Sequence, residues 1–137
     1  MREELPLVSL VVLNWNGEGC IEECLRSLFE QDYPSYEVIV VDNASTDASP
    51  RLVEEKFPQA RLVRNKANLG VARGVNKGIR LARGPLVAIL NNDVVLPGGW
   101  LSALVEELLR SPEVGIVSGA IYYREPGDVI WALGGLL

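Results

Sequence analysis

Two kinds of apolar pattern alternate along the chain: short unbroken runs, and longer stretches in which apolar residues recur every three or four positions. Short runs bounded by polar or turn residues predict β-strands. They cover residues 8–13, 38–41, 61–64, 86–90 and 114–117. The run at 86–90 is uninterrupted and apolar, so we expect that strand to be covered on both faces. The run at 61–64 is only weakly apolar, which favours a place near the edge of the sheet.

The stretches with a period of three to four residues predict four amphipathic helices. They cover residues 21–29, 49–57, 72–82 and 101–109. The second helix begins with Ser49 followed by a proline, a combination typical of an N-cap residue and the first helical position. A proline also follows each of the first two helices, where it prevents the helix from continuing.

Strands and helices that alternate at short spacing predict an α/β fold, with a mostly parallel sheet and helices on both faces. The sequence contains no internal repeat and no linker, so we interpret residues 1–137 as a single domain. Residues 129–137 are apolar up to the last residue, which is unusual at the end of a domain. We therefore expect the chain to be truncated.

Composition and charge exclude several classes of protein. A net charge of −5 argues against a nucleic-acid-binding protein, because such proteins usually present a basic face. The sequence has no run of 18 or more apolar residues and no secretory signal, which predicts a cytoplasmic protein without a membrane span. Cys20 and Cys24 lie one helical turn apart in a chain without histidine, so we interpret them as reduced, packed thiols rather than a zinc site.

Polar residues follow three of the predicted strands, at 14–16, 42–43 and 91–93. Ligands of parallel sheets gather at the carboxyl ends of the strands. If the first and fourth strands are neighbours, Trp15 and Asp93 line one cleft and Asp42 lies on its far side. An aromatic ring, a carboxylate for a base or ribose hydroxyl, and a metal-binding carboxylate together predict a nucleotide diphosphate site. Taken singly, Trp15 could simply pack, Asp42 could cap the next turn, and residues 91–93 could form a polar turn.

Other phosphate-binding patterns fit the sequence less well. The nicotinamide-binding fingerprint Gly-x-Gly-x-x-Gly is matched by Gly17 and Gly19, but its third position is Glu22, whose side chain would repel a pyrophosphate. The Gly-x-x-x-x-Gly-Lys-Ser/Thr loop of ATPases is absent. A pyrophosphorylase-like transferase would need a basic, glycine-rich loop after the first strand, and residues 14–18 do not form one.

Four successive motifs carry a family resemblance: Val-Val-Leu-Asn-Trp-Asn-Gly at 11–17, Glu-Val-Ile-Val-Val-Asp-Asn-Ala-Ser-Thr-Asp at 37–47, Asn-Leu-Gly-Val-Ala-Arg-Gly-Val-Asn at 68–76, and Leu-Asn-Asn-Asp at 90–93. In order and spacing they resemble the family 2 glycosyltransferases, over essentially the whole chain from Pro6 on. The last motif, with Ile130-Trp131 and Gly134-Gly135, is most similar to the rhamnosyltransferase-like branch. The resemblance implies the N-terminal, donor-binding half of a Rossmann-like GT-A fold.

The resemblance also implies roles for individual residues. Asp93 matches the last acid of the family's Asp-x-Asp motif and would ligate Mg²⁺ or Mn²⁺, while Asn91 replaces the first acid. Asp42 would hold the nucleoside, Trp15 would lie beside the base, and Asn92 would contact ribose or phosphate. The implied nucleotide-sugar-binding positions are Asn14, Trp15, Asn16, Asp42, Asn43, Asp47, Asn68, Gly70, Arg73, Asn76, Asn91 and Asn92. For Arg73 the alternatives are a diphosphate contact and a surface salt bridge.

The implied activity is metal-dependent, inverting transfer of a sugar from a dTDP- or UDP-sugar to a hydroxyl of a saccharide or lipid-linked acceptor, as in polysaccharide biosynthesis. The family's general base lies in the later half of the domain, and we expect it beyond the end of this chain. In the full-length form we expect a peripheral location at the inner face of the membrane. The alternative is a non-catalytic nucleotide-sugar-binding module. We further expect a homo-oligomer formed through residues 114–137, because exposed apolar patches tend to associate.

Overall fold

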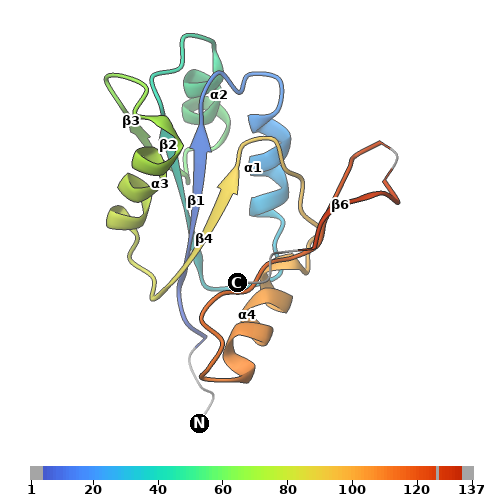
Figure 1. Ribbon diagram of the computed structural model, residues 1–137. Helices are drawn as coiled ribbons and strands as arrows, with labels where there is room; N and C mark the ends of the chain where they lie inside the picture. The colour runs from blue at the N-terminus through green and yellow to red at the C-terminus, as the bar shows by residue number, and fades with distance from the viewer. Residues whose placement is uncertain (1–4, 126, 134–137) are drawn as a thin grey trace.

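A computed structural model describes residues 5–125 and 127–133. The strands and helices follow one another as β1 (Val8–Asn14), α1 (Ile21–Phe29), β2 (Tyr36–Asp42), α2 (Ser49–Lys56), β3 (Arg61–Arg64), α3 (Gly70–Leu81), β4 (Leu86–Asn91), α4 (Trp100–Arg110), β5 (Ile121–Tyr122) and β6 (Ile130–Ala132). The first four strands form a parallel sheet in the order β3-β2-β1-β4 (Figure 1). The predicted α/β fold, the edge position of the third strand and the pairing of the first and fourth strands are therefore confirmed.

One face of the sheet carries most of the core. Successive side chains of a strand point to opposite faces, so Val8, Leu10 and Val12 of β1 share a face with alternate residues of β2 and β4. The apolar sides of α1, α2 and α4 pack against this face and bury it. Phe29, at the end of α1, stacks on Phe57 just after α2, with 5.9 Å between the ring centroids. We call this the covered face.

The opposite face is packed by α3, which lies very close to β1 and β2 (Figure 1). Glycines one turn apart on α3 permit this approach. A Cβ built on Gly78 would lie 2.2 Å from Cγ1 of Val11, and one on Gly74 would lie 2.5 Å from Cδ1 of Leu13. The resulting cluster is small and consists of Val11, Ile39 and Val41.

The expectation that the fourth strand is covered on both faces is wrong. Leu86, Ala88 and Leu90 of β4 contribute to the covered face, but Val87 and Ile89 point the other way and are exposed, Ile89 by 56%. Ile89 is the register partner of Val11, which α3 buries completely. Since α3 lies over β1 and β2, it leaves the neighbouring strip along β4 open. We call this strip, Val87 and Ile89, the open strip.

The chain after α4 differs from the prediction. Residues 114–117 do not form a strand; instead, β5 and β6 form a short antiparallel hairpin. Figure 1 shows this hairpin projecting away from the sheet, and a bidentate ion pair between Arg124 and Glu23 links it to α1. Ile130 and Trp131 lie in β6, whereas Gly134 and Gly135 lie outside the described residues. An apolar run such as 114–117 forms a strand only where a neighbouring strand offers hydrogen bonds.

The start of α2 also differs in detail. The helix begins at Ser49 itself, so the predicted N-cap residue is the first helical residue, and Ala48 precedes it without a side-chain cap. The carboxylate of Asp47 accepts a hydrogen bond from the Ser49 amide at 3.0 Å and another from the Ser49 hydroxyl. Asp47 thus satisfies an amide that an N-cap side chain would otherwise serve. Among the described residues, no helix has the length and hydropathy needed to cross a membrane.

Candidate functional site

The polar ends of β1, β2 and β4 lie side by side at one end of the sheet. Asn14 is the register partner of Asp42, and the residue before it, Leu13, pairs with Asn91. Because all three strands run in the same direction, their carboxyl ends meet there (Figure 1). The predicted gathering of the three polar segments is therefore present in the structure.

Asn14 lies at the centre of this arrangement and is completely buried. Its side-chain amide donates to Oδ1 of Asp42 at 2.9 Å and to the Ser49 hydroxyl at 2.9 Å. Its side-chain oxygen accepts a hydrogen bond from Nδ2 of Asn92 at 2.8 Å. One buried side chain thus connects the ends of β1 and β2, the start of α2 and the turn after β4.

Gly17 is required by this arrangement for a steric reason. A Cβ at position 17 would lie 2.3 Å from Oδ1 of Asn14 and 2.3 Å from Nδ2 of Asn92, the two atoms that share the hydrogen bond. Any side chain at this position would push the two amides apart. The sequence placed Gly17 in a phosphate-binding fingerprint and in the family motif at 11–17, and neither indicated this steric role; its place directly after an Asn-Trp-Asn segment was the available signal.

The loops after β1 and β2 are tied together. Asn16 donates from its backbone amide to the Ser45 hydroxyl at 2.9 Å, and its side-chain oxygen accepts from the Thr46 amide at 2.8 Å. The Glu18 amide donates to the Asp47 carboxylate at 2.8 Å. Asn16 adopts a positive φ of 49°, a conformation that asparagine tolerates well. These contacts give the loops a defined shape before any ligand binds.

A second chain of amides joins the end of β2 to the start of α3. The Asn43 side chain donates to the carbonyl of Gly70 at 3.0 Å and accepts from the Asn65 side chain at 2.8 Å. Asn68 accepts from the Gly70 amide at 2.8 Å, and Gly70 has a φ of +75°, which favours glycine. Asn65 in turn accepts from the Lys77 ammonium. Asn65 and Lys77 were not singled out from the sequence.

The predicted site residues fall into three groups by accessibility. Exposed side chains at or near the strand ends belong to Trp15, Asn16, Asn68, Arg73, Asn91 and Asp93, while Asp47 and Asn92 are half-buried. Asn14, Asp42 and Asn43 are buried, with Asp42 only 1% exposed. Here these three side chains form hydrogen bonds with other groups of the protein, and their contact with the donor stays a prediction.

Two predicted positions, Arg73 and Asn76, lie on α3 after Gly70. Gly74 and Gly78 face the sheet, so by the helical period of 100° per residue Asn76 lies on the opposite, outer side of α3. The structure therefore does not bring Asn76 to the strand ends. Arg73 is exposed, and none of the ion pairs formed within residues 5–125 and 127–133 involves it. The salt-bridge alternative for Arg73 is thus not observed.

The surroundings of Cys20 show that two carboxylates flank the start of α1. Partial burial raises the pKa of the Cys20 thiol, and the negative charges of Asp93 and Asp47 raise it further. The Asp93 and Asp47 side chains thus act on one thiol from the turn after β4 and the loop after β2. Both cysteines are free thiols, as expected.

Asp93 is the residue that could hold a metal ion here. In the described part of the chain no three side chains of histidine, cysteine, aspartate or glutamate cluster in a way that would hold a metal by themselves. A cation at exposed Asp93 would therefore need oxygen ligands from a bound diphosphate and from water. Mg²⁺ and similar hard cations commonly bind in this way.

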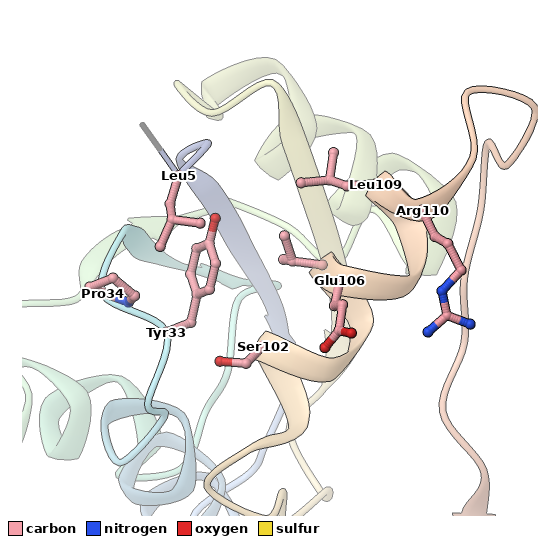
Figure 2. A pocket seen from close by; sticks show the side chains of 8 residues that line it. Leu5, Tyr33, Pro34, Ser102, Glu106, Leu109 and Arg110 are labelled. Atoms are coloured by element: carbon pink, nitrogen blue, oxygen red, sulfur yellow. The ribbon is translucent and has the colours of Figure 1, made fainter. Parts of the chain in front are cut away.

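A separate hollow lies at the other end of the molecule. A cavity of about 460 Å³ lies between the segment before β1, the Tyr33-Pro34 turn and α4 (Figure 2). Its walls are largely apolar, with Leu5 and Leu109 facing it from opposite sides, and the Tyr33 hydroxyl donates to the carbonyl of Pro6 at 2.7 Å. None of the predicted site residues lines this cavity, so the strand ends remain the candidate site.

Comparison with known proteins identifies the architecture. The profile of Glycosyl transferase family 2 matches residues 9–135. The succinoglycan biosynthesis protein ExoO of Rhizobium meliloti is 33% identical over 105 residues, which cover 76% of this chain and 30% of that protein. The chain spans between 30% and 41% of the length of the curated relatives that it matches.

Solved structures agree with the sequence comparison. The mannosyltransferase PcManGT from Pyrobaculum calidifontis, solved in complex with GDP-Man and Mn²⁺, superimposes with a TM-score of 0.76 at 36% identity, over 86% of this chain and 36% of that chain. TarS 1-349 of S. aureus, in complex with UDP, gives a TM-score of 0.67 at 30% identity, over 73% and 32%. The parallel sheet β3-β2-β1-β4 is therefore a Rossmann-like sheet of the GT-A type. On its sequence and its fold, this chain belongs to glycosyl transferase family 2.

Proposed function

We propose that the chain forms the donor-binding part of a metal-dependent, inverting glycosyltransferase, and that its donor is a nucleotide-diphosphate sugar. The observation that carries this proposal is the convergence of the ends of β1, β2 and β4, which places Trp15 and Asp93 at the same edge of the sheet. Solved relatives of the same fold hold GDP-Man with Mn²⁺ or UDP. A dTDP- or UDP-sugar is the donor we favour, by resemblance to the rhamnosyltransferase-like branch.

Three of the exposed residues have proposed roles. Asp93 would ligate Mg²⁺ or Mn²⁺, which when bound offsets the negative charge on the diphosphate. Trp15, 57% exposed, offers its ring to the base, and Arg73 at the start of α3 offers a guanidinium to the diphosphate. The nucleoside contact proposed for Asp42 requires the Ser45 segment to shift, because Asp42 already accepts hydrogen bonds from the amide and the hydroxyl of Ser45.

In the transfer itself, an acceptor hydroxyl attacks the anomeric carbon from the face opposite the diphosphate. The new carbon–oxygen bond forms as the bond to the diphosphate breaks, the electron pair leaves with the nucleotide diphosphate, and the hydroxyl proton passes to a general base. We propose that this base and the acceptor-binding surface lie outside residues 1–137. The acceptor would be a saccharide or a lipid-linked saccharide, in keeping with the name of ExoO.

The experiment that tests donor binding uses Trp15 as a reporter. The chain has three tryptophans, so Trp100 and Trp131 are first replaced by phenylalanine. UDP and dTDP are then titrated with and without Mn²⁺, by fluorescence and by calorimetry. We expect saturable binding that Mn²⁺ strengthens, and we expect this effect of Mn²⁺ to disappear in Asp93→Ala, whose thermal unfolding should match that of the parent protein.

Other outcomes have equally definite meanings. Failure of both nucleotides to bind in the presence of Mn²⁺ would contradict the proposed donor site. In a chain that also carries the proposed general base, binding of the intact nucleotide sugar without its hydrolysis or transfer would instead favour the alternative, a nucleotide-sugar-binding module that does not catalyse transfer.

A further inference from the structure

The turn that carries Asp93 is attached to the rest of the site by few contacts. Beneath it, the Cys24 thiol donates to the carbonyl oxygen of Asn91 at 3.6 Å, and Val94 packs against the core of the covered face. On the side facing β1, Asn92 donates its 2.8 Å hydrogen bond to Asn14. Cys24 and the core thus hold the two ends of the turn, whereas Asn92 holds its middle, directly before Asp93.

Asn14 is itself held rigidly by partners on its other side. Its amide nitrogen donates to Asp42 and to Ser49, and the Ser49 hydroxyl donates to Asp47. In the described part of the chain every buried side-chain nitrogen and oxygen has a hydrogen-bond partner. A side chain fixed at its nitrogen by a carboxylate and a hydroxyl has one orientation, so its oxygen presents a fixed acceptor to Asn92.

We infer that Asn14 is a positioning residue of the donor site: through its hydrogen bond to Asn92 it sets the location of Asp93 relative to Asp42 at the end of β2 and to the loop that contains Asp47. This inference rests on the proposed function, since it assigns to Asn14 and Asn92 a role in metal-dependent donor binding. Asn14 is completely buried, so in this inference it does not contact the donor itself. It supports Asp93, the residue proposed to hold the metal at the donor.

The structure supplies two independent ways to break the same hydrogen bond. Asn92→Ala removes the donor and keeps the bonds from the Asn14 side-chain nitrogen to Asp42 and Ser49, while the buried Asn14 oxygen loses its partner. Gly17→Ala leaves both amides in place and inserts a methyl group between them, 2.3 Å from each bonded atom. Gly19→Ala is the matched control, because a Cβ at Gly19 would have no atom within 4 Å and its φ is not in the left-handed region. Asn14→Ala is avoided, since it would leave the buried carboxylate of Asp42 short of a donor.

The first readout requires no ligand. Order parameters from ¹⁵N relaxation report how firmly the backbone amides of Asn92 and Asp93 are held in the free protein. We expect them to fall in Asn92→Ala and Gly17→Ala, and to equal the parent value in Gly19→Ala. Unchanged order at Asp93 in both Asn92→Ala and Gly17→Ala would overturn the inference, whether or not the protein binds a nucleotide.

The second readout is the ratio of UDP affinity with Mn²⁺ to UDP affinity without it. Supporting residues around a metal ligand typically change affinity by 10- to 100-fold, so we expect this ratio to fall about tenfold in Asn92→Ala and in Gly17→Ala. In Gly17→Ala, which retains the Asn92 side chain, the metal-free affinity should stay within about twofold of the parent value, which a general loss of structure would not allow.

The double variant separates a shared bond from two unrelated effects. If both changes act on one hydrogen bond, Gly17→Ala with Asn92→Ala should cost no more than either change alone. Additive losses would show that the two residues act independently and would contradict the inference. Absence of any nucleotide binding by the parent protein would contradict the proposed function, and the order parameters would still decide the role of Asn14.

Discussion

The two faces of the sheet are built from the same strands and differ greatly in how they are covered. On the covered face, Leu10 of β1 is buried under three helices together with its neighbours in β2 and β4. On the other face, α3 buries Val11 and Ile39 but leaves Ile89 of β4 more than half exposed. Alternate residues of one apolar run therefore have different surroundings.

The difference shows what the composition of a strand can and cannot indicate. An apolar run indicates that both faces of a strand favour burial against other apolar side chains. It does not show which helix, if any, covers each face. The close approach of α3 to β1 and β2 depends on Gly74 and Gly78, and among the described residues no helix covers β4 on this face. Four predictions, ordered by the size of the expected effect, test this contrast.

The largest effect is expected when a large side chain of the covered face is compared with one of the open strip. Leu10→Ala should lower the free energy of unfolding by about 3 kcal/mol, because it leaves a cavity in a fully buried cluster. Ile89→Ala should cost less than about 1 kcal/mol, since its side chain is already largely hydrated. Chemical denaturation measures both, and equal losses would show that the open strip is covered in solution.

The close packing of α3 should be sensitive to a single methyl group. Gly78→Ala places a Cβ 2.2 Å from Val11, so we expect a net loss of about 1–2 kcal/mol, although alanine favours the helix by itself. Asn76→Ala, on the outer side of the same helix, is the control and should change stability by less than about 0.5 kcal/mol. A stabilised Gly78→Ala variant would mean that α3 can move away from β1.

Exposed apolar residues should also affect association. Exposed apolar side chains are numerous after α4, where Ile116 is 85% exposed and Trp131 is 62% exposed. We therefore propose that copies of the chain associate through the described part of residues 114–137. Light scattering at high concentration should show a dimer or larger species, which Ile116→Lys combined with Trp131→Ser reduces. Ile89→Lys is the counterpart on the open strip and should have less effect. A monomer at high concentration would contradict the proposal.

The smallest effect concerns pH. Burial alone would raise the pKa of Asp47, but hydrogen bonds from the Ser49 hydroxyl and from the amides of Glu18 and Ser49 outweigh it and hold the pKa below its ordinary value of 3.8. A carboxyl with a lower pKa in the folded state contributes stability that is present above pH 3.8 and is lost as the pH falls through the folded-state pKa.

The corresponding measurement is thermal unfolding between about pH 5 and about pH 3. The parent protein should lose more stability over this range than Asp47→Asn, which retains an acceptor for the amides and has no titratable group there. Parallel pH profiles for the two proteins would show that Asp47 contributes nothing to the acid sensitivity of the fold.

Local patterns predicted the regular elements well. Each of the first four strands and all four helices begin and end within two residues of the expected position, because apolar periodicity and turn residues are properties of neighbouring positions. The predicted strand at 114–117 was wrong because a strand needs a neighbouring strand for its backbone hydrogen bonds. The local sequence does not show whether such a neighbour is present. The coverage of Ile89 was misjudged because it depends on where α3 lies.

The sequence predicted which residues gather at the candidate site but not which of them are buried. The motifs correctly brought together Trp15, Asp42 and Asp93, since parallel strands place their carboxyl ends at one edge. They did not reveal that Asn14 is buried while Trp15 beside it is exposed. Whether a polar residue is a ligand contact or an internal support depends on partners such as Ser49 and Asn92, which are 35 and 78 positions away.

The Asn14–Asn92 bond has a consequence for protein engineering by exchange of segments. A chimaera that takes the end of β1 from one relative and the turn after β4 from another would combine residues 14 and 92 from two different proteins. If the relative that supplies the end of β1 had a side chain at position 17, or the relative that supplies the turn had no amide at position 92, this hydrogen bond would not form. The turn after β4 would then lose its attachment even though each segment was intact. Residues 14, 17 and 92 must therefore be transplanted together.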